Sequence, residues 1–141
     1  MKYWSQMRAL SSPKAARKTD IRSAANPVPV FRFRLRITAG KRIAIGPGKV
    51  ALLEAIRATG SLTAAAKSLE MSYRRAWLLL DELNKSLETP AVESAQGGEH
   101  GGGSRLTPVG EQLVAIYRRI EGNAAASNAR DIKRLLAMLA D

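Results

Sequence analysis

Apolar residues recur every three or four positions through the middle of the chain, a spacing that predicts three consecutive helices. The first covers residues 47–59 and stops at a glycine, which often ends helices. Ser61 can cap a second, alanine-rich helix over 62–69, and Ser72 can cap a third over 73–87. The third helix is expected to face the core with Ala76, Leu80, Leu83 and Leu87, widened by Trp77 and Leu79.

Alternating patterns predict strands on both sides of these helices. Residues 31–38 read FRFRLRIT, which places four apolar side chains on one face of a strand and three arginines on the other. The arginines can meet phosphate or form an ordinary solvated face. Residues 39–48 are expected to turn the chain. Further along, 91–95 and 104–106 are expected to be short strands around a loop, 96–103, that holds five glycines.

Two further helices are predicted after this hairpin. Thr107 and Pro108 form a strong helix start, with the threonine as cap and the proline in the first turn. The stripe expected to be buried is Val109, Leu113, Ile116 and Ile120. Gly122 and Asn123 should weaken the helix, and an amphipathic segment over 127–140 follows. Its apolar residues are Ile132, Leu135, Leu136 and Leu139.

The order of elements predicts a mainly α protein with a small β-sheet. The sequence β-α-α-α-β-β-α, plus a C-terminal helix, is that of a winged helix-turn-helix. We expect residues 31–122 to form this domain and 123–141 to form a C-terminal helix that could make a dimer contact. Residues 1–30 are basic, rich in Ser, Ala and Pro, and expected to be a disordered arm.

The charge distribution favours a polyanionic partner. The chain has 141 residues and a net charge of +11, and residues 1–49 hold 12 Lys or Arg against one acid. Residues 50–141 are balanced, with 11 of each sign. A positive arm on a neutral body suits nucleic acid, although a solubilising tail has the same composition. The chain has no cysteine, so disulfides are excluded, and no apolar run reaches the roughly 18 residues of a membrane helix.

The third helix carries the residues best suited to read DNA. A helix fits the major groove and meets base edges first with its N-terminal residues. Arginine can bond the O6 and N7 atoms of guanine together, while serine or tyrosine can bond phosphate or a base edge. The same arginines could also be ordinary solvated residues of an amphipathic helix. The candidates are Ser72, Tyr73, Arg74 and Arg75, with Lys67 on the preceding helix.

The glycine-rich hairpin tip is the second candidate site. A nucleotide-binding loop lies between a strand and a helix and ends in lysine, whereas this loop lies between two strands. Its backbone could approach DNA through Gly97, Gly98 and Gly101, with Arg105 as the nearby cation; a floppy loop without ligand is the alternative. His100 and Glu99 are too few for a metal site. No pattern supplies a nucleophile, so we expect no enzyme, metal or cofactor.

These residues resemble a known family. The segments GSLTAAAKSLEMSYRRAW and VESAQGGEHGGGSRLTPVGEQLVAIY resemble the N-terminal DNA-binding domain of the ModE family of molybdate-responsive transcriptional regulators. The helix-turn-helix part is also similar to LysR-type regulators. The resemblance covers about half of the chain. It implies a DNA-binding dimer in which residues 72–75 enter the operator and residues 97–105 form the wing.

We expect no counterpart here of the family's molybdate-binding β-barrels. About 20 residues follow Ile120, and they look helical, so the resemblance extends to DNA binding and not to molybdate sensing. We therefore expect a cytoplasmic, homodimeric regulator of transcription, a repressor, that binds double-stranded DNA and no membrane. The alternative is a small protein-interaction module or a partner subunit of another regulator.

Overall fold

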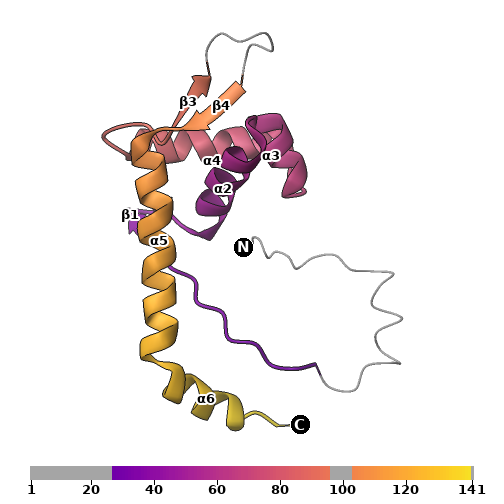
Figure 1. Ribbon diagram of the computed structural model, residues 1–141, viewed down its shortest axis with the longest axis vertical. Coiled ribbons are helices and arrows are strands. Elements are labelled where there is room, and N and C mark those ends of the chain that lie inside the picture. Colours follow the sequence, from indigo (N-terminus) through magenta and orange to yellow (C-terminus); the bar gives the residue numbers. More distant parts are fainter. Residues whose placement is uncertain (1–26, 96–102, 141) are drawn as a thin grey trace. The chain divides into compact units, whose positions relative to one another are not determined.

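The computed structural model describes residues 27–95 and 103–140 (Figure 1). The chain divides into two compact units, residues 35–119 and a second unit described over 27–34 and 120–140. The elements are, in order, β1 (Ile37–Ala39), β2 (Arg42–Ile45), α2 (Pro47–Thr59), α3 (Leu62–Ser68), α4 (Tyr73–Ser86), β3 (Val92–Ala95), β4 (Gly103–Leu106), α5 (Pro108–Ser127) and α6 (Ala129–Ala137). This is the predicted mainly α fold with small antiparallel sheets.

Local signals fix the ends of the three central helices, as the sequence predicts. Gly60 follows α2 with φ +81°, a left-handed backbone that glycine adopts without steric cost. The hydroxyl of Ser61 accepts the backbone N–H of Ala64 at 2.9 Å and so caps α3. The hydroxyl of Ser72 accepts the N–H of Arg75 at 3.1 Å and caps α4 in the same way.

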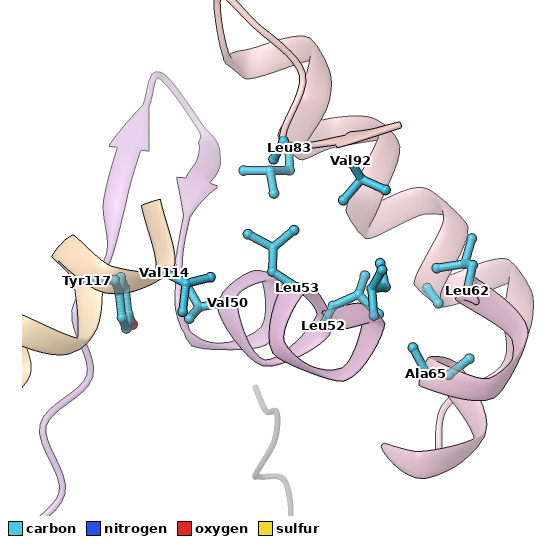
Figure 2. Close-up of a cluster of buried hydrophobic side chains, with 13 residues drawn as sticks. Val50, Leu52, Leu53, Leu62, Ala65, Leu83, Val92, Val114 and Tyr117 are labelled. Atoms are coloured by element: carbon cyan, nitrogen blue, oxygen red, sulfur yellow. The ribbon is translucent and has the colours of Figure 1, made fainter. Parts of the chain in front are cut away.

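The three helices bury a common core (Figure 2). Leu53 of α2 is fully buried and faces Leu83 of α4, while Ala65 of α3 is small enough to let its neighbours approach closely. Burying one leucine contributes about 1.5–3 kcal/mol. The buried apolar residues are Val50, Leu52, Leu53, Ile56, Leu62, Ala65, Ala66, Ala76, Leu83, Ala91, Val92, Val114 and Tyr117.

The first predicted strand is wrong over most of its length. Residues 31–36 have no regular secondary structure, and the predicted turn over 39–48 contains β2. β1 and β2 form a hairpin because Gly40, at φ +66°, permits a tight reversal. Apolar residues and arginines do alternate in this segment, but Phe31 and Phe33 are about 40% exposed. The alternation therefore does not mark a face that packs against the rest of the protein. The described residues thus form two separate two-stranded sheets, β1–β2 and β3–β4.

The buried face of α5 agrees with the prediction only in part, since Leu113 of the expected stripe packs half-buried against the core. Gly110, Val114 and Tyr117 face the core, whereas Ile116 and Ile120 of the expected stripe are more than 40% exposed. The Tyr117 hydroxyl donates to the Leu35 carbonyl at 2.7 Å, which fixes this face. The helix continues past Gly122 and Asn123 without interruption. α6, described over its whole length, buries none of its residues.

Candidate nucleic-acid interface

The turn between α3 and α4 is tight and is closed by backbone hydrogen bonds. The Glu70 N–H donates to the Lys67 carbonyl and the Met71 N–H donates to the Ala66 carbonyl, both at 3.0 Å. Glu70 reaches this geometry with φ +57° and is the only non-glycine residue in the described chain with positive φ. The turn therefore holds the start of α4 at a defined angle to α3.

Replacing Glu70 with glycine should stabilise the protein. A non-glycine residue in the left-handed region carries a steric cost of roughly 1–2 kcal/mol, which glycine avoids. Part of this gain in stability is offset because glycine also gives the unfolded chain more conformational freedom. We expect Glu70→Gly to raise the free energy of unfolding in urea by about 1 kcal/mol. Glu70→Ala removes the charge and keeps the strain, so it should bring no such gain. An equal gain in both variants would contradict the strain argument.

The first turn of α4 presents the predicted reading residues together. Ser72, Tyr73, Arg74 and Arg75 are all exposed, and the buried Ala76 that follows turns the core face of the helix away from them. The N-terminal end of a helix carries partial positive charge, which adds to that of the two guanidinium groups. Lys67 is exposed in the last turn of α3, five residues before Ser72. The turn and the caps therefore bring these cations to one end of the helix pair.

A surface hollow of about 300 Å³ lies along α4 and includes this first turn. It is lined by Ser72, Arg74, Arg75, Leu78, Leu79 and Glu82. Cationic and apolar side chains thus share one concave surface on the same helix. Such a mixed surface can bond polar base edges and phosphates at one end and contact apolar groups further along.

Trp77 corrects the sequence-based assignment of the core. The sequence predicts that Trp77 widens the buried stripe of α4, but its side chain is 47% exposed. The core stripe itself is confirmed, since Ala76 and Leu83 are buried and Leu80 and Leu87 are half-buried. Three to four apolar residues per two turns are sufficient to fill this face. Trp77 lies beyond its edge, next to solvent.

The wing strands β3 and β4 pair in antiparallel register, with Glu93 opposite Arg105. The Arg105 Nε donates to the Glu93 carboxylate at 2.9 Å, and both side chains are about half exposed. An exposed pair of this kind contributes about 0–1 kcal/mol, so Arg105 can leave it for a phosphate at little cost. The predicted contacts Gly97, Gly98 and Gly101, and His100 with them, lie outside the described residues.

Lys49 supports α4 through its contacts, and the sequence pattern did not reveal it. Its side chain is only 5% exposed, its ammonium group forms an ion pair with Glu82 of α4 at 3.2 Å, and it donates to the Ile43 carbonyl of β2. A lysine in the first turn of a helix is normally a surface residue. Here it ties α4 to α2 and to the first hairpin.

Asn84 fixes the other end of α4. Its side-chain oxygen accepts the Ala91 N–H at 2.8 Å, and this bond holds the segment that leads into β3. The Ala91 carbonyl in turn accepts the Thr107 N–H at 2.9 Å, at the start of α5. α4 and the β3–β4 hairpin are therefore held by the same short network of hydrogen bonds. The sequence pattern gave no sign of this role for Asn84.

The described part of the chain offers little for other kinds of site. No group of three His, Asp or Glu residues there is arranged to hold a metal ion. None of the helices described between residues 27 and 140 combines the length and apolar character needed to cross a membrane.

Comparison with known proteins finds similarity over the central segment of the chain. Residues 48–111 match the bacterial regulatory helix-turn-helix proteins of the lysR family. The chain is 47% identical over 81 residues to the molybdenum-pterin-binding protein MopB of Rhodobacter capsulatus, covering 57% of this chain and 30% of that protein. It is 39% identical over 83 residues to the transcriptional regulator ModE of Yersinia pestis, covering 59% of this chain and 32% of that protein.

Two further proteins match a similar share of the chain. The DNA-binding transcriptional dual regulator ModE of Escherichia coli K12 is 35% identical over 83 residues, with 59% of this chain and 32% of that protein covered. The structure of full-length CbnR with its target DNA gives a TM-score of 0.45 at 24% identity, over 62% of this chain and 28% of that one. The chain spans about a third of the length of the curated relatives it matches. Residues 48–111 are therefore similar to the helix-turn-helix of the lysR family, and the chain resembles the ModE regulators over about a third of their length.

Proposed function

We propose that this chain is a sequence-specific DNA-binding transcriptional regulator of the ModE type, a repressor that acts in the cytoplasm as a homodimer. The observation that carries the proposal is the capped first turn of α4, where Arg74 and Arg75 are exposed beside Tyr73 in a lysR-type helix-turn-helix. Arginines at the N-terminal end of a recognition helix can form bidentate hydrogen bonds to guanine in the major groove. The residues of the site are Ser72, Tyr73, Arg74, Arg75, Lys67 and Arg105, with Gly97, Gly98 and Gly101 of the wing loop.

The uneven charge supports the same function. Between residues 27 and 53 the sequence contains six basic residues and no acid. Arg36, Lys41 and Arg42 of this segment are exposed at the first hairpin, and β2 of that hairpin contacts α4. Cations beside a reading helix can contact phosphates without reading sequence. We therefore propose that this segment and the basic residues before it supply affinity for DNA, and that α4 supplies selectivity for its sequence.

Selection of binding sites from random duplex DNA tests the function directly. The purified chain should enrich one motif, and a dimer should enrich it as two inverted half-sites about one helical turn, or a multiple of it, apart. Recovery of unrelated sequences after repeated rounds would contradict sequence-specific binding. Enrichment of a single half-site would retain the DNA-binding function and remove the dimer.

The exposed side of α5 offers a surface for the second copy. Ile116 is 41% exposed and Ile120 is 43% exposed, and they lie four residues apart on one side of the helix. We expect Ile116→Glu to shift the free protein from dimer to monomer in analytical ultracentrifugation, because the carboxylate would be buried at the contact. Ala115→Glu adds the same carboxylate at an exposed position on a different side of α5, so it should leave the mass unchanged. A dimer that survives Ile116→Glu would contradict this contact.

The exposed side of α6 supports the alternative, a protein-interaction module. Leu135, Met138 and Leu139 are each more than half exposed, which is unusual for three large apolar residues within five positions. A chain that elutes as a monomer, shows no operator affinity at low salt and gains mass only with a different protein would favour this function.

A further inference from the structure

α4 exposes two large apolar side chains just behind its cationic first turn. Trp77 is 47% exposed and Leu78 is 43% exposed, while the core side of the same helix is already filled by Ala76 and Leu83, at 0% and 1%. The two exposed residues therefore add little to the stability of the described fold. Their position needs an explanation outside the packing of the core.

Their place on the helix links them to the proposed reading residues. Positions four apart are neighbours on a helix surface, so Leu78 continues the row of Arg74 and Trp77 continues the row of Tyr73. Leu78 also lines the same surface hollow as Arg74. Further along the helix, Lys85 is 71% exposed and pairs with Asp81 at 2.9 Å. The apolar pair thus lies between a cationic end and an ion pair.

The major groove of DNA contains one apolar group that such side chains can contact. Among the base edges exposed there, only thymine presents a methyl group, and the others present hydrogen-bond donors and acceptors. A helix that enters the groove with its N-terminal turn brings the next turn along the same groove. Leu78 and Trp77 are apolar, exposed and positioned in that next turn.

Charge argues for DNA rather than a second copy of this chain as the occupant. A two-fold contact through this side of α4 would bring Arg74 of one copy close to Arg74 of the other. Like charges placed together at an interface oppose association, whereas a polyanion complements them. Arg74 is a surface neighbour of both apolar residues, three positions from Trp77 and four from Leu78.

We propose that Leu78 and Trp77 contact thymine methyl groups, so that the chain selects thymine next to the base pair contacted by Arg74. The proposal rests on the proposed function, because it requires α4 to lie in the major groove. It adds a specificity for one base that the arginines do not supply. Leu78, on the row of Arg74, is the residue whose contact the experiment isolates most cleanly.

Deoxyuridine substitution tests this contact one methyl at a time. Deoxyuridine keeps every hydrogen bond of thymine and lacks only the 5-methyl group. On the duplex enriched by selection, single thymine-to-deoxyuridine changes should weaken binding of the unchanged protein by about fourfold at one or two positions per half-site. Other thymines should show no effect. Affinities are measured by fluorescence anisotropy on otherwise identical duplexes.

Alanine variants assign each methyl to a side chain. Leu78→Ala should bind the thymine duplex more weakly and lose the deoxyuridine effect at one position. Trp77→Ala should lose the deoxyuridine effect at a different thymine position. Arg74→Ala, the matched control, should bind more weakly overall and keep both deoxyuridine effects. Leu78 and Trp77 are exposed, so these variants are expected to fold, which unfolding midpoints can verify.

Several outcomes separate this inference from the function on which it rests. Specific binding with no deoxyuridine effect, or an unchanged effect in both Leu78→Ala and Trp77→Ala, overturns the thymine contact and leaves the regulator intact. A lower self-association in Leu78→Ala together with an unchanged deoxyuridine effect identifies a protein occupant and also overturns it. Absence of any sequence-specific binding removes the proposed function and this inference together.

Discussion

Gly110→Ala is expected to destabilise the protein severely. A Cβ atom at Gly110 would lie 2.2 Å from the Ala91 carbonyl oxygen, a distance that real side chains do not adopt. That oxygen is backbone and already accepts the Thr107 N–H, and the Gly110 N–H donates to the Thr107 hydroxyl at 3.1 Å. Overpacking typically costs about 1–3 kcal/mol, and a rigid backbone neighbour places this change at or above the upper end.

The sign of the effect makes Gly110→Ala informative. Within a helix, alanine is normally more stable than glycine by about 1 kcal/mol. Gly122 lies in the same helix, and a Cβ atom there would meet nothing within 4 Å. Gly122→Ala should therefore raise the free energy of unfolding in urea by about 0.5–1 kcal/mol. If Gly110→Ala were as stable as Gly122→Ala, the close packing of α5 on the β3 segment would be contradicted.

Arg74→Ala should remove selectivity for one base pair of the operator. A two-armed contact to guanine contributes about 1–3 kcal/mol, so binding to the selected duplex should weaken by about 5- to 150-fold. The loss should disappear when the guanine opposite Arg74 is replaced, because the changed duplex lacks the contact in both proteins. Arg75→Ala is expected to behave similarly at a different position. Both side chains are exposed, so the fold should be unaffected.

Lysine variants separate base reading from phosphate contact. Arg74→Lys keeps the positive charge and loses the planar fork that bonds O6 and N7 together. A base contact predicts that Arg74→Lys loses much of the selectivity while keeping most of the affinity for random DNA. Equal weakening of Arg74→Ala on all sequences, with full recovery in Arg74→Lys, would assign Arg74 to the phosphate backbone.

The parts of the fold that the sequence predicted well are those set by local chemistry. The ends of α2, α3 and α4 depend on Gly60, Ser61 and Ser72, whose capping hydrogen bonds reach residues at most four positions away. The cap at Thr107 is equally local and equally visible. For the same reason the sequence correctly placed the four residues that begin α4 together at one exposed helix end.

The parts that the sequence did not predict depend on partners far along the chain. The buried row of α5 is chosen by the contact of Gly110 with Ala91 and by the bond from Tyr117 to Leu35, 82 residues away. Apolar spacing alone does not decide between two adjacent rows of one helix. Lys49 was missed because its carboxylate partner, Glu82, lies on another helix.

The ratio of specific to non-specific affinity tests the central claim most directly. The unchanged chain is titrated onto its selected duplex and onto a scrambled duplex of the same composition, at about 0.15 M salt, where exposed charges more than about 8 Å apart are largely screened. The proposed regulator predicts a ratio of about 10³ or more in favour of the selected duplex. A ratio near one, with binding to both duplexes falling equally as salt is raised, would contradict sequence-specific reading by α4.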